Sequence, residues 1–149
     1  MLLKTLLLLS LALLLSADIL QLNSRTTPIT LKSQHNQKQE LLHNGIWIIS
    51  SDKKRTKMVN EFFDNFEKPN SVNLIMDTTR IPSFLFNLFV LPRIKKHKHQ
   101  ILLSHDKAYN STLPYKKGYL TILHVKSKIV TKIQFLKNRE DLEKFFQKP

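Results

Sequence analysis

The stretch Gly45 to Phe63, GIWIISSDKKRTKMVNEFF, predicts a buried strand that runs directly into a helix. Residues 46–49 are a continuous run of β-branched and aromatic side chains, which is typical of a strand covered on both faces. Three residues that favour a helix N-cap, Ser50, Ser51 and Asp52, follow. Apolar residues then recur every four positions from Met58 to Phe66, so we expect an amphipathic helix of about four turns.

Strands and helices alternate along the rest of the chain. The predicted order begins with a weak hairpin over 29–42, the strand and helix just described, a strand over 71–77 and an apolar helix over 83–91. A strand over 100–106, a loop over 107–118 and two alternating strands over 119–125 and 129–135 follow. The last helix begins at Asn138, where Asn138 and Asp141 form a capping box. Thr78 or Thr79 is expected to cap the apolar helix, with Pro82 in its first turn and Pro92 ending it. Such alternation implies parallel crossovers and an α/β fold with one mixed sheet.

The amino-terminal residues have the pattern of a secretory signal. Lys4 precedes an apolar run from Leu6 to Leu15, and the small residues Ser16 and Ala17 follow. The run is shorter than the roughly 20 residues of a membrane span. We expect cleavage after Ala17, a polar lead over 18–27, a single domain over 28–149, and a periplasmic or secreted location. Because Leu15 stands where a smaller residue is usual, an uncleaved N-terminal tether is the alternative.

Composition limits the chemistry of the chain. It has 149 residues, a formal net charge of +13 and no cysteine. No disulfide can therefore hold the domain, which depends on its hydrophobic core. The charge predicts attraction to anionic surfaces without specifying a partner.

The order of elements resembles the thioredoxin-like superfamily, in particular its exported, peroxiredoxin-related branch. The resemblance rests on the quoted stretch, on SVNLIMD at 71–77 and on GYLTILHVKSKIVTKIQFLKNREDLEKFF at 118–146. It implies a thioredoxin-like mixed sheet with an N-terminal hairpin, central parallel strands, a C-terminal antiparallel hairpin and flanking helices.

The resemblance also implies where redox chemistry would lie. The family places a reactive cysteine at the N-terminus of the first helix, where the thiolate is stabilised. This chain has Ser50, Ser51, Asp52 and Lys53 there, so thiol–disulfide exchange is excluded and no cofactor is expected. The family's cis-proline before the closing hairpin has no counterpart either, because Pro114 lies too far upstream.

Two cationic segments are candidate anion sites. At the start of the first helix, a phosphate or carboxylate could accept backbone amides near Ser51 and Asp52 and be neutralised by Lys53, Lys54 or Arg55. The alternative is that these cations are solvated and that Asp52 already fills the cap. The second segment is a basic patch formed by Arg93, Lys95, Lys96, His97 and Lys98. It lacks the interleaved aromatics of single-stranded nucleic-acid sites, so nucleic acid is not an expected partner.

His97 and His99, with His105 as a third ligand, are candidate metal ligands. The neighbouring lysines repel a cation and no acidic ligand is expected nearby, so no metal is expected.

The apolar helix offers another contact surface. Phe84, Phe86 and Phe89 lie in a segment that is apolar nearly all round, whereas a helix on one sheet face buries only part of its circumference. The remaining surface either packs inside the protein or contacts a partner or a membrane.

These patterns predict an exported, non-catalytic binding or accessory protein of the cell envelope. Its partner would be an unknown envelope protein or an anionic surface. No catalytic residue is expected, because the chain has no nucleophile-elbow motif. Two alternatives stay open: an enzyme of this fold acting on an anionic substrate without cysteine, and a secreted polyanion-binding protein.

Overall fold

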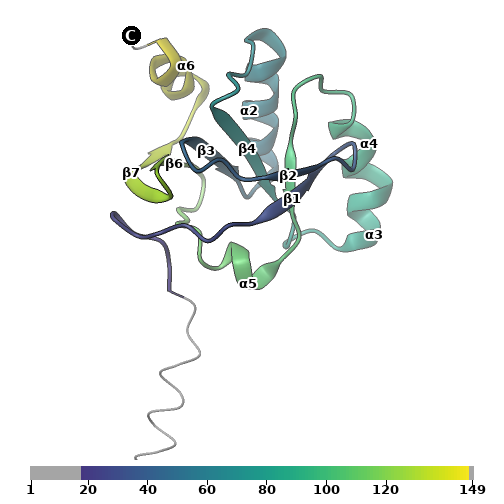
Figure 1. Ribbon diagram of the computed structural model, residues 1–149. Coiled ribbons are helices and arrows are strands. Elements are labelled where there is room, and N and C mark those ends of the chain that lie inside the picture. The colour runs from purple at the N-terminus through teal and green to yellow at the C-terminus, as the bar shows by residue number, and fades with distance from the viewer. Residues whose placement is uncertain (1–17, 148–149) are drawn as a thin grey trace, which may run out of the picture.

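The computed structural model describes residues 18–147, which form one seven-stranded mixed sheet in the order β2-β1-β5-β4-β3-β6-β7 (Figure 1). The strands are β1 (Thr30–Ser33), β2 (Lys38–Glu40), β3 (Gly45–Ser50), β4 (Val72–Asp77), β5 (Leu102–Ser104), β6 (Leu120–Lys126) and β7 (Ile129–Leu136). The helices are α2 (Lys53–Asn65), α3 (Ser83–Leu85), the π-helical η1 (Phe86–Val90), α4 (Leu91–Ile94), α5 (Lys107–Asn110) and α6 (Arg139–Gln147). The predicted α/β fold with a mixed sheet is confirmed.

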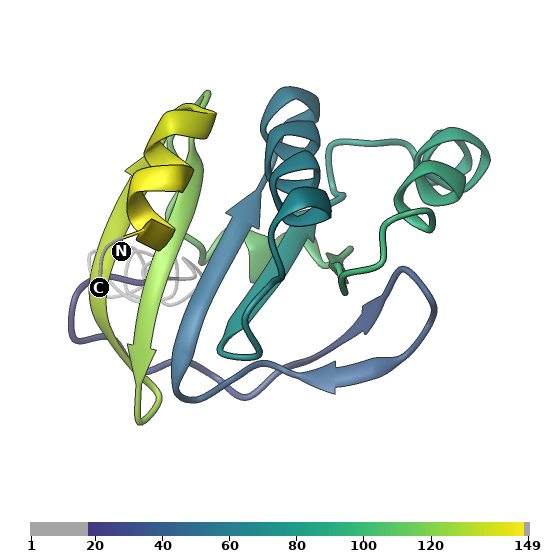
Figure 2. The same ribbon diagram turned by 90° about the horizontal axis from the view of Figure 1, so that it is seen from above.

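The three central strands β3, β4 and β5 are parallel, and every other neighbouring pair is antiparallel. Both parallel connections step in the same direction across the sheet. Because such crossovers are right-handed, their helices lie on the same face. Figure 2 shows α2 and α6 side by side on that face, and α3 and α4 lie on the side of α2 that is away from α6.

Each face of the sheet carries its own hydrophobic core. The core under the helices contains Ile48, Leu74, Phe62, Phe86 and Leu142 among others. The opposite core contains Trp47, Ile49, Ile75 and Leu123, and the partly buried Leu20 and Tyr109 pack against it. Strand β3 therefore contributes to both cores, which confirms the prediction that it is covered on both faces.

The quoted stretch begins at a glycine because the backbone requires one. Gly45 has a φ of +145°, and a Cβ placed there would lie 2.3 Å from the carbonyl oxygen of Ser71. That same oxygen accepts the amide of Ile46 at 2.8 Å as β3 begins to pair with β4. The glycine thus permits the close approach that starts the parallel pair.

The closing hairpin and last helix form as predicted. Ser127 and Lys128, both with positive φ, make the turn between β6 and β7. Before α6, the Asn138 side chain accepts the amide of Asp141 at 2.9 Å, and the Asp141 carboxylate accepts the amide of Asn138 at 3.3 Å. These reciprocal bonds confirm the capping box.

The apolar helix differs from its prediction at both ends. Pro82 is its N-cap residue, whereas the Thr78 and Thr79 hydroxyls donate to Ser104 and Asp77 instead. Pro92 does not end it, because α4 continues through Ile94. The preceding π-helical turn explains this: the Leu91 amide bonds to Phe86, five residues back, and the wider turn accommodates the proline ring.

The predicted loop over 107–118 contains one short helix, α5. Its N-cap residue is Asp106, whose carboxylate accepts the amide of Tyr109 at 3.1 Å. The signal-like pattern of residues 1–17 lies outside the described residues. Within 18–147, no helix has the length and apolarity needed to cross a membrane.

Candidate functional site

The junction between β3 and α2 is closed by its own side chains. Asp52 is the N-cap residue, and its Oδ1 accepts the amide of Arg55 at 2.8 Å. The Thr56 hydroxyl donates to the Ser50 hydroxyl oxygen at 3.0 Å inside the protein. The helix N-terminus therefore already has an anion, the Asp52 carboxylate, in the position where an external anion would accept amides.

The three cations of the junction are placed differently from one another. Lys53 and Lys54 are exposed, but Arg55 is only 9% exposed. Its Nη2 lies near Gly118, 3.6 Å from where a Cβ at that glycine would be, and its Nε has no hydrogen-bond partner within residues 18–147. The side chain is thus buried beneath the loop that precedes β6 and is not presented to a solvent anion. The anion site predicted at Ser51 to Arg55 stays a prediction.

The loop before β6 lies next to the junction, because Nη2 of Arg55 lies near Gly118 of that loop. The Thr121 hydroxyl donates to the Pro114 carbonyl at 2.7 Å, so Pro114 reaches the start of β6 despite its distance along the sequence. No cis peptide bond occurs between residues 18 and 147.

The basic patch is largely exposed at the end of the apolar helix. Arg93, Lys95, Lys96 and Lys98 are exposed, and among the described residues no ion pair joins any of them to a carboxylate. His97 differs from the other four members because it turns toward α2. The positive charge of the four cations is therefore uncompensated by neighbouring carboxylates.

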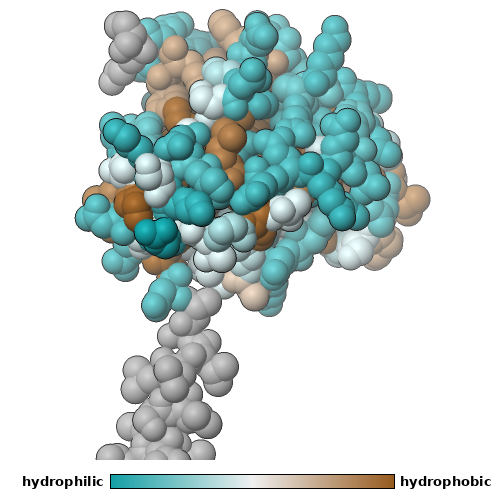
Figure 3. Space-filling model, viewed as in Figure 1, coloured by the Kyte–Doolittle hydropathy of each residue, from teal (hydrophilic) through white to brown (hydrophobic). Residues whose placement is uncertain are grey.

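The apolar helix exposes part of its surface to solvent. Phe84 and Leu88 are each 64% exposed and Phe89 is 56% exposed. We call these three residues the apolar patch. Phe86, which the sequence placed in the same contact surface, is instead 4% exposed and packs edge-on against the His105 ring. Figure 3 shows hydrophobic residues at the right-hand edge of a mostly hydrophilic face, where α3 and α4 lie in Figure 1.

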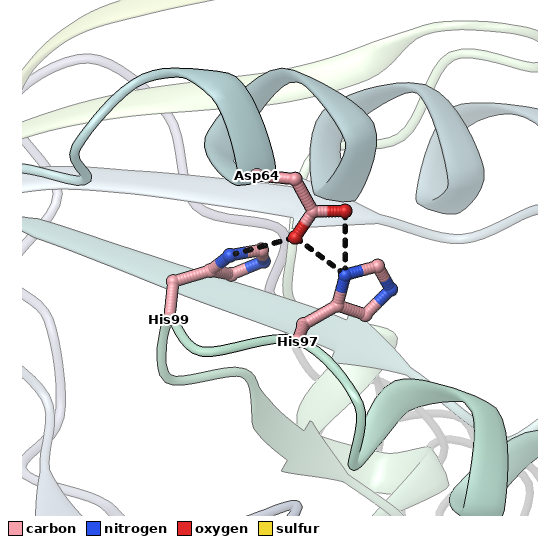
Figure 4. Close-up of side chains that lie close together, drawn as sticks. All are labelled: Asp64, His97 and His99. Carbon is pink, nitrogen blue, oxygen red and sulfur yellow. Dashed lines mark hydrogen bonds and ion pairs between the residues drawn. The ribbon is translucent and has the colours of Figure 1, made fainter.

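A cluster of three side chains, Asp64, His97 and His99, joins two segments that are far apart in the sequence. The Asp64 carboxylate at the end of α2 contacts Nδ1 of His97 with its two oxygens at 2.8 and 2.9 Å, and its Oδ1 lies 3.7 Å from Nδ1 of His99 (Figure 4). The sequence-based statement that no acidic residue lies near these histidines is therefore wrong. His105, the third candidate ligand, is not a member of this cluster and contacts Thr78.

His99 is the most perturbed member of this cluster. Its side chain is 5% exposed, and its Nε2 hydrogen-bonds Oδ1 of Asn60 at 2.8 Å. Burial, together with the nearby His97 and Lys68 side chains, lowers the pKa of His99 to about 4, although Asp64 acts in the opposite direction. The His99 ring is therefore neutral at physiological pH.

Comparison with known proteins defines the fold class. The chain matches no family model and no curated protein. Among solved structures it is similar to StoA from Bacillus subtilis, with 15% identity, a TM-score of 0.55, and coverage of 81% of this chain and 97% of that one. It is also similar to the thioredoxin domain of a thiol-disulfide oxidoreductase from Bacteroides vulgatus (13% identity, TM-score 0.52, coverage 85% and 98%). A peroxiredoxin-like protein from Aquifex aeolicus gives 8% identity, a TM-score of 0.51 and coverage of 83% and 80%.

The chain thus has a thioredoxin-like fold that resembles peroxiredoxins and thiol-disulfide oxidoreductases. It contains no cysteine, so the thiolate chemistry associated with this fold is unavailable to it.

Proposed function

We propose that the protein is an exported, non-catalytic thioredoxin-like binding protein that attaches to anionic lipid at the surface of the cell envelope. Export is supported by the signal-like pattern of residues 1–17. The absence of cysteine and the self-capped junction at Asp52 argue for a role without catalysis.

The observation that carries the proposal is the apolar patch beside exposed cations. Phe84, Leu88 and Phe89 project from a helix that continues directly into Arg93, Lys95 and Lys96. Peripheral membrane helices combine the same two features, because apolar side chains enter the lipid interface while cations stay near the phosphates. Each basic residue close to an anionic membrane contributes about 1 kcal/mol of attraction.

Vesicle binding by the mature chain, residues 18–149, tests this function, because the apolar run from Leu6 to Leu15 would itself bind vesicles. We expect binding to vesicles containing anionic phosphatidylglycerol, weaker binding at high salt, and little binding to vesicles of phosphatidylcholine alone. Replacing both Phe84 and Phe89 with Ser should weaken binding at least about tenfold, because burying one such side chain contributes roughly 1.5–3 kcal/mol.

The matched control is Leu22→Ser, which removes an apolar side chain that is 58% exposed but lies outside the apolar patch. This variant should bind vesicles like the parent. Equal loss of binding in the control and in the double variant would contradict the role of the patch. If the parent does not bind vesicles but stably captures an envelope protein, the lipid proposal is wrong and the binding partner is a protein.

A further inference from the structure

The cluster of Asp64, His97 and His99 has ligand atoms within reach of a single ion. One ligand atom from each side chain lies within 4.8 Å of the other two. Figure 4 shows the carboxylate from α2 and the two imidazoles from the loop after α4 pointing toward one another. Ligands bound tetrahedrally to Zn²⁺ at 2.0–2.1 Å lie about 3.3 Å apart, so shifts of well under 1 Å would bring the two closest pairs to this spacing.

The tautomer of His99 distinguishes the cluster from an ordinary ion pair. The amide nitrogen of Asn60 donates to the Thr56 carbonyl at 2.9 Å, which directs Oδ1 of Asn60 toward His99. Because that oxygen can only accept, Nε2 of His99 carries the proton and Nδ1 carries a lone pair. Asn60 therefore fixes the ring as an outer-shell partner fixes a metal-bound histidine.

The lone pair of His99 faces a second acceptor. Nδ1 of His99 is buried, has no hydrogen-bond partner within residues 18–147, and lies 3.7 Å from Oδ1 of Asp64. Two acceptors that face each other without a donor are unfavourable unless a cation or a donating water lies between them. We propose that Asp64, His97 and His99 bind a transition-metal ion, Zn²⁺, through one carboxylate oxygen and the two Nδ1 atoms.

The kind of metal follows from the ligands and from the charge around them. Imidazole suits Zn²⁺, whereas Ca²⁺ and Mg²⁺ prefer oxygen ligands. Exposed lysines such as Lys96 and Lys98 flank His97 and disfavour any cation held by charge alone. When Zn²⁺ binds, the Nδ1 proton that His97 donates to Asp64 moves through solvent to Nε2 of the same ring. The Asp64 side chain is 41% exposed, so water can complete the coordination.

Zinc titration of the full chain, first stripped with a chelator, tests the site. We expect one Zn²⁺ per chain by calorimetry and a Zn²⁺-dependent rise in melting temperature, with no rise for Mg²⁺ or Ca²⁺. Asp64→Asn and His97→Gln should each lose at least about tenfold in zinc affinity, because loss of an outer-shell partner alone costs roughly 10- to 100-fold. Asp64 and His97 are partly solvated, so circular dichroism should report folded variants.

The matched control is His35→Gln, which removes an exposed histidine from the turn between β1 and β2. It should bind zinc like the parent. A parent chain that binds no zinc, or zinc affinity that is unchanged in both Asp64→Asn and His97→Gln, would overturn the proposal. Neither result bears on vesicle binding, which depends on other residues.

Discussion

A cysteine introduced at Asp52 tests whether the β3–α2 junction retains the electrostatics of a thiolate site. Because the chain has no other cysteine, Asp52→Cys would carry the only thiol in the protein. Its sulfur would lie close to the place where Oδ1 of Asp52 accepts the amide of Arg55 at 2.8 Å. A thiolate there would gain that hydrogen bond and the favourable end of the α2 dipole.

The size of the effect follows from these contacts. A charge at a partly buried helix terminus is stabilised by up to about 2 kcal/mol. One pKa unit corresponds to about 1.4 kcal/mol, so the thiol pKa should fall from about 8.5 to roughly 7. Lys53 and Lys54 are exposed and add little, because solvent screens them. The loss of the Asp52 cap should cost about 1 kcal/mol of the free energy of unfolding.

The rate of iodoacetamide alkylation as a function of pH measures this pKa. The matched control is Asn70→Cys, an exposed position at the opposite end of the parallel strands from Asp52. Its thiol should titrate near the ordinary value of about 8.5. If the thiol at position 52 titrates within about 0.3 units of the control, the helix terminus does not stabilise a thiolate and the reasoning fails.

Three further predictions concern stability, measured by urea unfolding. Gly45→Ala should cost about 3 kcal/mol or more of the free energy of unfolding, because positive φ combines with a Cβ only 2.3 Å from a backbone oxygen. Gly118→Ala, where the nearest atom to the added Cβ is at 3.6 Å, should cost about 1 kcal/mol. Equal costs for the two variants would refute the clash at Gly45. Phe86→Ala should cost about 3–5 kcal/mol and the exposed Phe89→Ala less than about 0.5 kcal/mol, and the reverse order would contradict the assigned faces of the helix. Asn138→Ala should cost about 1 kcal/mol through the lost cap of α6, and an unchanged midpoint would exclude that cap.

The strands were predictable because their apolar runs are local and unambiguous. Residues 46–49 and 71–77 each read as buried strands, and both lie in the centre of the sheet. The helix at Asn138 was likewise marked by a cap and an apolar stripe. In these segments, local preference and tertiary packing agree.

The buried face of the apolar helix and its helical periodicity could not be predicted from the sequence, for two physical reasons. A segment with few polar side chains does not reveal which face is buried, so Phe84, Phe86 and Phe89 could not be told apart. Its π-helical turn also breaks the periodicity of 3.6 residues on which such reasoning depends. The short helix α5 was missed because only four residues and one cap define it.

Sequence reasoning paired His97 with His99 but missed Asp64, because this carboxylate is distant from them in sequence. Asp64 and His97 are 33 residues apart and meet only because α2 packs beside the loop after α4. Motif spacing detects ligands on one element, whereas this cluster depends on the tertiary fold. Likewise, no local pattern marks the burial of Arg55 beneath the loop before β6.

The central claim is that the apolar patch enters an anionic lipid surface, and one labelled position tests it most directly. Leu88→Cys accepts a single environment-sensitive bimane label, because the chain has no other cysteine. The control is Asn70→Cys, an exposed position just before the start of β4. On phosphatidylglycerol vesicles, we predict a blue shift of the bimane emission at position 88 and none at position 70. An unchanged spectrum at position 88, or equal shifts at both positions, would contradict the account.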